Sequence, residues 1–475
     1  MAFNVHQGGD NQAAIQWAYD GVPIVTENTD VGSHTNHNYL CKVSYWTGTG
    51  WSALGTMSSR GNALNYGVFD IQSVVLAGDR VAKGALQTLD TESTYEDNIQ
   101  TYAGREWYIK VQLGWKSDTQ PTTYPATKYY RIIGGALTDT FTSWSERPVS
   151  DYILKSNAGT YLTTRARGKG EGAFIYGNRP IMHVDVMPYD RYSVTYVAAK
   201  KGSGVGDDTW NSNVGKFQVK VIGGTPQTQT FTINALESIY VDTQAVPQTA
   251  NGLLLREIHF GPRDIMSLEA GGVDVYNGTM QGGIALGTWE YIDLVPMTSG
   301  NATTGNQIVR LHNMLKKEGG ACSGSERLQF KFRNRLGGFD YLSCRTYTKR
   351  VMNNQREEHM RRDTNYNSAN NVVDIETNNP HDFTRVSRVA SIQDKYTANT
   401  GYISEDMNAV VRELMTSQEV YVTKWVDNDT QVSSAPSFYP CLITSTSMSY
   451  MYRVTDKLVE YTFDFEYSNN PRPLI

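Results

Sequence analysis

Three acidic side chains recur near the C-terminus in the segment VEYTFDFEY, at Glu460, Asp464 and Glu466. Paired carboxylates serve hydrolases as general acid and base, so this row is the first candidate for chemistry. Because side chains alternate between the two faces of a strand, the three acids share one face, opposite Phe463. We favour a solvated or interface face over a catalytic pair, since charges of this kind also hinder unwanted pairing at a sheet edge.

A basic stretch precedes that row and offers it a partner of opposite charge. We interpret the two segments as possible interface surfaces, in which the acids of one copy of the chain meet the basic residues of a neighbouring copy. Clustered arginine is also the electrostatic footprint of nucleic-acid binding. Glu357 and Glu358 dilute the positive charge, and no helix that reads a DNA groove accompanies it, so we do not expect nucleic acid as a partner. The stretch contains Arg333, Arg335, Arg345, Lys349, Arg350, Arg356, Arg361 and Arg362.

No further constellation in the sequence specifies catalysis, a cofactor or a metal. The closest histidine pair, His34 and His37, has no third ligand at a workable spacing. The glycine-rich sequence around Cys322 is explained by a turn, because a nucleophilic thiol would need a base and an oxyanion pocket. Nucleophile-elbow, zinc-protease and nucleotide-loop motifs are absent. We therefore predict no enzyme, no cofactor and no catalytic or metal-binding residue.

Bulk properties narrow the class of protein further. The formal net charge is −5, so no global field draws the chain to nucleic acid or anionic lipid. The N-terminal sequence lacks the regions of a signal peptide, and no apolar run approaches the roughly 20 residues of a membrane helix. We expect a soluble protein made in a cytoplasm, without a membrane partner. For Cys41, Cys322, Cys344 and Cys441, which form no CxxC pair, we favour buried free thiols over disulfides or metal ligation.

Alternation of apolar and polar residues with a period of two is the dominant pattern. Trp107, Ile109, Val111 and Leu113, for example, share one face of a strand. The 30 tyrosines and 42 glycines suit half-buried strands joined by tight turns, and frequent turn signals favour antiparallel sandwiches over βαβ units. We predict a mainly β chain, with tandem antiparallel β-sandwich domains and a small C-terminal α+β part that carries one amphipathic helix.

Two breaks in composition divide the chain. Charged, glycine-rich residues 165–174 separate an N-terminal β-sandwich over 1–172 from a second β-sandwich over 173–348. Residues 349–371 have little period-two pattern, so 349–400 is predicted to be an extended polar arm or a surface loop. Residues 401–475 are predicted to form a helix and strands that close on the second domain. In that helix Ser404 is the expected N-cap, and the apolar stripe consists of Met407, Val410, Val411, Leu414 and Met415.

The segment NRLGGFDYL predicts a structural turn between two alternating strands. Gly337 and Gly338 permit positive φ and a tight reversal or bulge. Phe339 is expected to enter the core, and Asp340 to cap the turn.

From this turn onward the order of segments resembles that of uncharacterised structural virion proteins of tailed bacteriophages. The sequence runs FRNRLGGFDYL, a polar excursion, ISEDMNAVVRELMTSQEVYV, YPCLITSTS and VEYTFDFEYSNNPRP. The resemblance covers the last third of the chain well and the earlier sandwiches only in style. It implies a structural component of the neck, tail or fibre-attachment apparatus, built as a ring of identical copies that contact other virion proteins. It also implies a location in the virion after assembly in the host cytoplasm.

A receptor- or glycan-binding module at a tail tip is the alternative from a different class. Trp46, Trp51, Trp144 and Trp210 lie in or near expected turns, where aromatic rings could stack on sugar faces. A tail-associated depolymerase is a third class, and it would need the carboxylates of Glu460 and Asp464 to face each other in a cleft.

Overall fold

The structure is a computed structural model, and the part of the chain that it describes is mainly β, built from several antiparallel sheets as predicted. The described residues are 3–7, 15–29, 35–47, 50–77, 100–102, 106–119, 121–134, 182–186, 190–197, 199–200, 216–223, 228–234, 239–240, 255–262, 279–280, 284–285, 289–297, 309–313, 328–334, 337–344, 346–360, 365–367, 372–374, 385–404, 407–424, 438–447 and 458–468.

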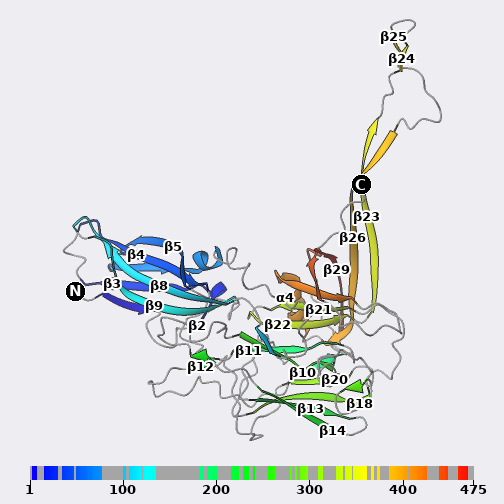
Figure 1. Ribbon diagram of the computed structural model, residues 1–475, viewed down its shortest axis with the longest axis horizontal. Coiled ribbons are helices and arrows are strands. Elements are labelled where there is room, and N and C mark those ends of the chain that lie inside the picture. The colour runs from blue at the N-terminus through cyan, green and yellow to red at the C-terminus, as the bar shows by residue number, and fades with distance from the viewer. Residues whose placement is uncertain are drawn as a thin grey trace.

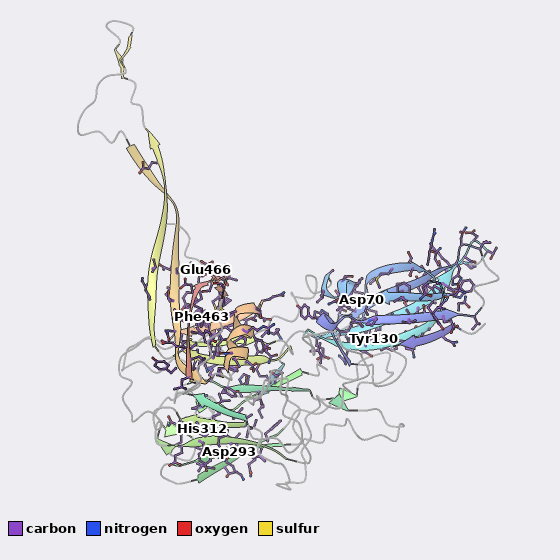
Figure 2. All side chains as sticks on the ribbon, turned by 180° about the vertical axis from the view of Figure 1, so that it is seen from behind. Asp70, Tyr130, Asp293, His312, Phe463 and Glu466 are labelled. Atoms are coloured by element: carbon purple, nitrogen blue, oxygen red, sulfur yellow. The ribbon has the colours of Figure 1, made fainter. Side chains whose placement is uncertain are left out.

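Two sheets form a sandwich in the N-terminal part of the chain (Figure 1). One has the strand order β1-β3-β6 and the other the order β2-β9-β8-β4-β5. Ile109, Val111 and Leu113 are fully buried in the core that both sheets share, as the alternation predicted. Figure 2 marks Tyr130 of this core, which is 2% exposed. The elements are β1 (Phe3–Gln7), β2 (Ile15–Trp17), the 3-10 helix η2 (Ala18–Asp20), β3 (Pro23–Asn28), β4 (Asn38–Trp46), β5 (Trp51–Arg60), β6 (Tyr66–Asp70), a helical segment at 72–77, β8 (Glu106–Lys116) and β9 (Thr123–Ile133).

The middle of the chain contributes a five-stranded sheet, β10-β20-β19-β13-β14, and a three-stranded sheet, β11-β16-β7. Phe217, Val219 and Leu294 are fully buried within the first of these. Strand β7 comes from the predicted first sandwich but pairs with β16, so this pairing joins the two regions. The elements are β7 (Gln100–Tyr102), β10 (Met182–Val186), β11 (Ser193–Val197), β12 (Ala199–Lys200), β13 (Lys216–Ile222), β14 (Thr228–Asn234), β15 (Ile239–Tyr240), β16 (Leu255–His259), β17 (Thr279–Met280), β18 (Ile284–Ala285), β19 (Tyr291–Met297) and β20 (Val309–Asn313).

A seven-stranded sheet, β22-β21-β27-β28-β29-β26-β23, organises the C-terminal part. The amphipathic helix α4 (Asn408–Thr416) packs on one face of this sheet, where Leu414 is fully buried with Phe330 and Phe465. The predicted apolar stripe is therefore confirmed. The strands are β21 (Leu328–Arg333), β22 (Phe339–Cys344), β23 (Thr346–Met360), β26 (Arg385–Ser404), β27 (Val420–Lys424), β28 (Phe438–Ile443) and β29 (Leu458–Tyr467).

Two details of the sequence prediction are wrong. Ser404 is the last residue of β26 and not the N-cap, because α4 begins at Asn408 with Met407 as its N-cap and without a capping hydrogen bond from that side chain. Strand β29 is not a sheet edge, since it lies between β28 and β26. Strand β26 brings the chain back to the sheet and pairs with β29. Strand β23 pairs with the other side of β26 and therefore lies outside both.

The segment predicted as an arm or loop contains a long two-stranded ribbon that projects from the sheet (Figure 1). The pairing of β26 with β29 ends at Tyr396 and Phe465, whereas its pairing with β23 continues to Met360 and Arg385. The outer part of the ribbon therefore has no third strand among the described residues. Two short strands, β24 (Asn365–Asn367) and β25 (Val372–Asp374), pair beyond it. The ribbon lacked a visible period-two pattern because its strands are polar at most positions.

Sheet membership also differs from the predicted domain limits. Strands β21 and β22 fall within the expected second sandwich, yet β21 pairs with β27 and so belongs to the C-terminal sheet. The predicted boundary at residues 172 and 173 lies outside the described residues.

Candidate functional site: a buried polar network and a projecting arm

The turn between β21 and β22 is built on glycine and on side-chain hydrogen bonds. Gly337 has φ 88°, and Asn334 Oδ1 accepts the Gly338 N–H at 3.0 Å. The Asn334 amide donates to Asp340 Oδ2 at 3.1 Å, and Phe339 is 1% exposed. A Cβ atom at position 337 would lie 3.0 Å from a side-chain carbon of Ile133, so the turn also approaches the end of β9 closely.

A charged network is buried where side chains of β11 and β16 meet those of β21 and β22. Oε1 of Glu257, a residue 1% exposed, lies 2.9 Å from Nζ of Lys331. Tyr341 donates its hydroxyl to the same oxygen at 3.0 Å, and Ser193 donates a short hydrogen bond to it. Burial opposes ionisation of Glu257, but the charges of Lys331 and His259 and the hydrogen bond from Ser193 outweigh it and lower the pKa of Glu257 to about 2. Glu257 is therefore ionised at neutral pH.

Further polar contacts join β21 and β22 to the residues just before β11. The side-chain amide of Gln329 donates to the Arg191 carbonyl at 2.6 Å and accepts the Arg191 N–H at 3.2 Å. The Ser343 hydroxyl donates to Asp190 at 2.7 Å. Strands β21 and β22 are thus held to the middle region by buried hydrogen bonds with specific geometry, which fix their relative position.

By residue type the network resembles an acid and base set, but its burial argues for a structural role. Ser193, Glu257, Lys331 and Tyr341 are each at most 6% exposed, so a substrate has no direct access to their reactive atoms. Sequence reasoning missed all four residues, because they are distant along the chain and a charge within an alternating strand predicts a solvated position. The only signal in the sequence was the position of Lys331, which lies between two apolar residues, Phe330 and Phe332, that point to the other face of the strand.

Of the predicted basic interface residues, the structure describes the side chains of Arg333, Lys349 and Arg350, and Arg333 does not share the exposed surface of the other two. Arg333 is buried, with Nε 2.7 Å from Oε2 of Glu419 and Nη1 donating to the Gly337 carbonyl at 2.8 Å. Arg350 is 61% exposed on β23, and its Nη2 lies 2.6 Å from Oδ2 of Asp394. Arg333 therefore stabilises the chain internally, whereas Arg350 belongs to the arm. The side chains outside the described part are those of Arg335, Arg345, Arg356, Arg361 and Arg362.

The acidic row lies on the face of the seven-stranded sheet opposite α4. Asp464 accepts a hydrogen bond from Thr397 at 2.7 Å and lies 3.8 Å from Nζ of Lys395. Glu460 accepts a hydrogen bond from Asn399 at 2.8 Å. The row alternates along β29 with buried aromatic residues such as Phe463, which Figure 2 marks together with Glu466. These contacts make the acids part of the polar surface shared by β26 and β29, and their pairing with a second copy stays a prediction.

An aromatic cluster covers part of the outer face of the first sandwich. The ring centroids of Trp46 and Trp51 are 5.3 Å apart, those of Trp51 and Tyr108 are 5.2 Å apart, and those of Tyr108 and Tyr129 are 6.1 Å apart. Lys110 places its ammonium 4.9 Å from the Trp51 ring centroid. Burial raises the pKa of the Tyr108 hydroxyl to about 12. The four aromatic side chains are half-buried against one another, so their packing explains them without a ligand.

The cysteines are structural where the structure describes them. Cys41, Cys344 and Cys441 are free and buried, which confirms the prediction for these three. Burial raises the pKa of the Cys41 and Cys441 thiols to about 12, which makes both unreactive. Trp144, Trp210, Cys322 and His34 lie outside the described residues.

Within the described ranges no group of three or more His, Cys, Asp and Glu residues is arranged to hold a metal ion. Within the same ranges no helix has both the length and the apolar character needed to cross a membrane.

Comparison with known proteins does not assign this chain to a family. No family model and no curated protein matches this chain. Solved structures that resemble parts of the chain include the calcium-binding domain CBD12 of CALX1.1, at 8% identity over 50% of this chain and 72% of that chain, with a TM-score of 0.18. Another is CBD12 from CALX1.2, at 7% identity over 60% of this chain and 79% of that chain, with a TM-score of 0.17. Scores this low carry no conclusion about fold or function.

Proposed function

We propose that this chain is a structural component of a tailed-phage virion, of the neck, tail or fibre-attachment type, that acts by self-assembly and by contact with other virion proteins. It is made and assembled in the host cytoplasm, and no catalysis belongs to the proposal. The segments between Phe332 and Pro473 resemble those of tailed-phage virion proteins, and this resemblance supports the assignment to a phage particle. The observation that carries the assembly role is the arm formed by β23 and β26.

The arm suits assembly because of its length and its polarity. A two-stranded ribbon is marginally stable in water, since it has no third strand and little apolar surface to bury. The outer part of this ribbon consists of the residues of β26 that precede Tyr396, where the pairing with β29 begins, and of their partners in β23. It also projects away from the rest of the chain (Figure 1). We infer that the arm gains stability by contact with another subunit.

Native mass spectrometry of the purified, untagged protein tests the self-assembly. Discrete closed oligomers are expected over a range of concentration and salt. A variant in which an Asn-Gly turn replaces residues 351–395 keeps the pairing of β26 with β29, so it should fold but lose these oligomers. A monomer at every concentration with the arm intact would contradict the proposal. Proteomic analysis of purified particles from cells that encode the chain tests its location, and absence of the chain from them would refute a virion role.

A receptor- or glycan-binding module is the second candidate, and the aromatic cluster of Trp46, Trp51, Tyr108 and Tyr129 is the observation that favours it. Aromatic rings on a sheet surface are suited to stacking on sugar rings. Glycan-array binding by the isolated protein, lost in Trp51→Ala with the fold retained, would support this function. If the protein binds nothing on the array, the glycans present on that array are excluded as its ligands.

A further inference from the structure

Strand β23 is an edge strand of unusual length. Its 15 residues pair with β26 on one side and with no described strand on the other. Typical strands have about 5–6 residues, and natural proteins protect exposed edges by short strands, charged side chains, bulges, proline or a covering loop. Residues 346–360 contain neither proline nor glycine. Its charged side chains oppose pairing with a strand of arbitrary sequence, so this long edge is a template for a strand whose charges are complementary.

The charges along β23 are ordered in a way that selects the partner. Lys349 and Arg350 lie near its beginning, and Glu357 and Glu358 lie near its end. Lys349, Arg350 and Glu358 are exposed. Parallel pairing of two such strands in register would set like charges side by side, which is unfavourable. Antiparallel pairing brings the basic end of one strand to the acidic end of the other.

We propose that β23 pairs antiparallel with β23 of a second copy of this chain, about a two-fold axis at Asn354. In this register Arg350 faces Glu358 of the second copy, and Lys349 lies diagonal to its Glu357. Both contacts occur twice because of the symmetry. The Arg350 side chain is available for this contact, since it is 61% exposed while it binds Asp394.

The pairing supplies what the isolated ribbon lacks. It converts two marginal two-stranded ribbons into one four-stranded sheet with the order β26-β23-β23-β26, in which each β23 forms hydrogen bonds along both sides. The pairing presupposes the self-assembly proposed above and names its partner and its surface. Because a two-fold contact closes after two copies, a ring of identical copies must use a second surface as well.

A charge-exchange series tests the register. Arg350→Glu and Glu358→Arg should each weaken the dimer by a factor on the order of ten or more, because each replaces two attractive contacts by two repulsive ones. The double variant should regain the affinity, since it restores opposite charges with exchanged positions. Arg60→Glu is the matched control, because Arg60 is exposed at the end of β5, far from β23 in the sequence. A double variant as weak as either single variant would overturn the proposal. The readout is sedimentation equilibrium at low and high salt.

Cysteine cross-linking gives a second, independent test. In a Cys322→Ser background the remaining native thiols are buried. Asn354→Cys should form a disulfide-linked dimer under mild oxidation, because each Asn354 faces its counterpart across the axis, whereas Val351→Cys, which faces Glu357, should not. Oligomers that form without a cross-link at position 354 would refute this pairing and leave the proposed self-assembly to another surface. A monomer at all concentrations would refute both.

Discussion

Replacing Lys331 by methionine is expected to destabilise the contact between the middle region and the C-terminal sheet by about 3–5 kcal/mol. The substitution removes the ammonium 2.9 Å from Oε1 of Glu257 and keeps a side chain of similar length. Glu257 is then left with its carboxylate 1% exposed and without its nearest opposite charge. The pKa of Glu257 agrees in direction, because its lowering from 4.5 to about 2 corresponds to about 3 kcal/mol of net stabilisation of the ionised form by Lys331, His259 and Ser193 together, after the cost of burial.

Hydrogen exchange followed by mass spectrometry measures this effect where it occurs. Amide protection in β11, β16 and β21 should fall by roughly two to three and a half orders of magnitude in Lys331→Met. Protection in β8 of the first sandwich should change little, because that strand has its own core. Lys395→Met is the matched control, since its ammonium lies 3.8 Å from Asp464 and both side chains are 39% exposed. We expect about 0–1 kcal/mol for that exposed pair.

The reasoning fails if Lys331→Met costs no more than Lys395→Met. A double-mutant cycle with Glu257→Gln separates the pair from the individual side chains. Each single variant leaves one buried charge without its partner, so the double variant should be less destabilised than the sum of the two. Additive effects would mean that Lys331 and Glu257 do not stabilise each other.

Three further outcomes are expected. Gly337→Val should lower the free energy of unfolding, measured in denaturant, by about 2 kcal/mol or more, because φ at this position is 88° and a Cβ atom would lie 3.0 Å from Ile133. The control Gly50→Ala should be nearly neutral, since a Cβ atom there would have nothing within 4 Å. Because the pKa of Glu257 is lowered in the folded chain, the stabilisation from Glu257 should be fully present above pH of about 4.5 and lost as pH falls toward 2. Acid unfolding of Glu257→Gln that matches the parent protein over this range would contradict this expectation. Leu414→Ala should cost about 2–5 kcal/mol, because Leu414 is fully buried under the sheet, while the exposed Arg412 on the same helix should tolerate alanine within about 0.5 kcal/mol.

Local pattern was enough to predict the elements whose two faces differ in environment. The buried residues of β8 alternate with half-buried ones, as do those of β29, and both strands were visible from their sequences. The apolar stripe of α4 was visible for the same reason, because one side of the helix packs on a sheet and the other meets solvent. The N-cap at Ser404 was wrong because β26 continues through that residue by pairing with Leu458, and tertiary pairing overrode the capping preference.

Residues that are similar in type proved to have different surroundings, which no local pattern distinguishes. Arg333 and Arg350 belong to one basic stretch, yet Arg333 is buried against Glu419 and Arg350 is exposed on the arm. Lys331 resembles a solvated lysine in its strand, yet it is buried because β16 brings Glu257 to it from a distant part of the chain. The identity of the opposing strand decided each case.

The amino-acid sequence alone therefore specifies the strands that alternate, the helix and the glycine turn, but not the strands of the ribbon, because alternation, amphipathic spacing and positive φ are properties of neighbouring residues. The tertiary structure alone specifies that β21 and β22 join the C-terminal sheet, that Glu257 meets Lys331, and that β23 is an edge strand among the described residues. These features depend on which distant segments pair. Pairing is decided by hydrogen bonds and burial between residues far apart in the chain, and such contacts leave little signal in either segment by itself.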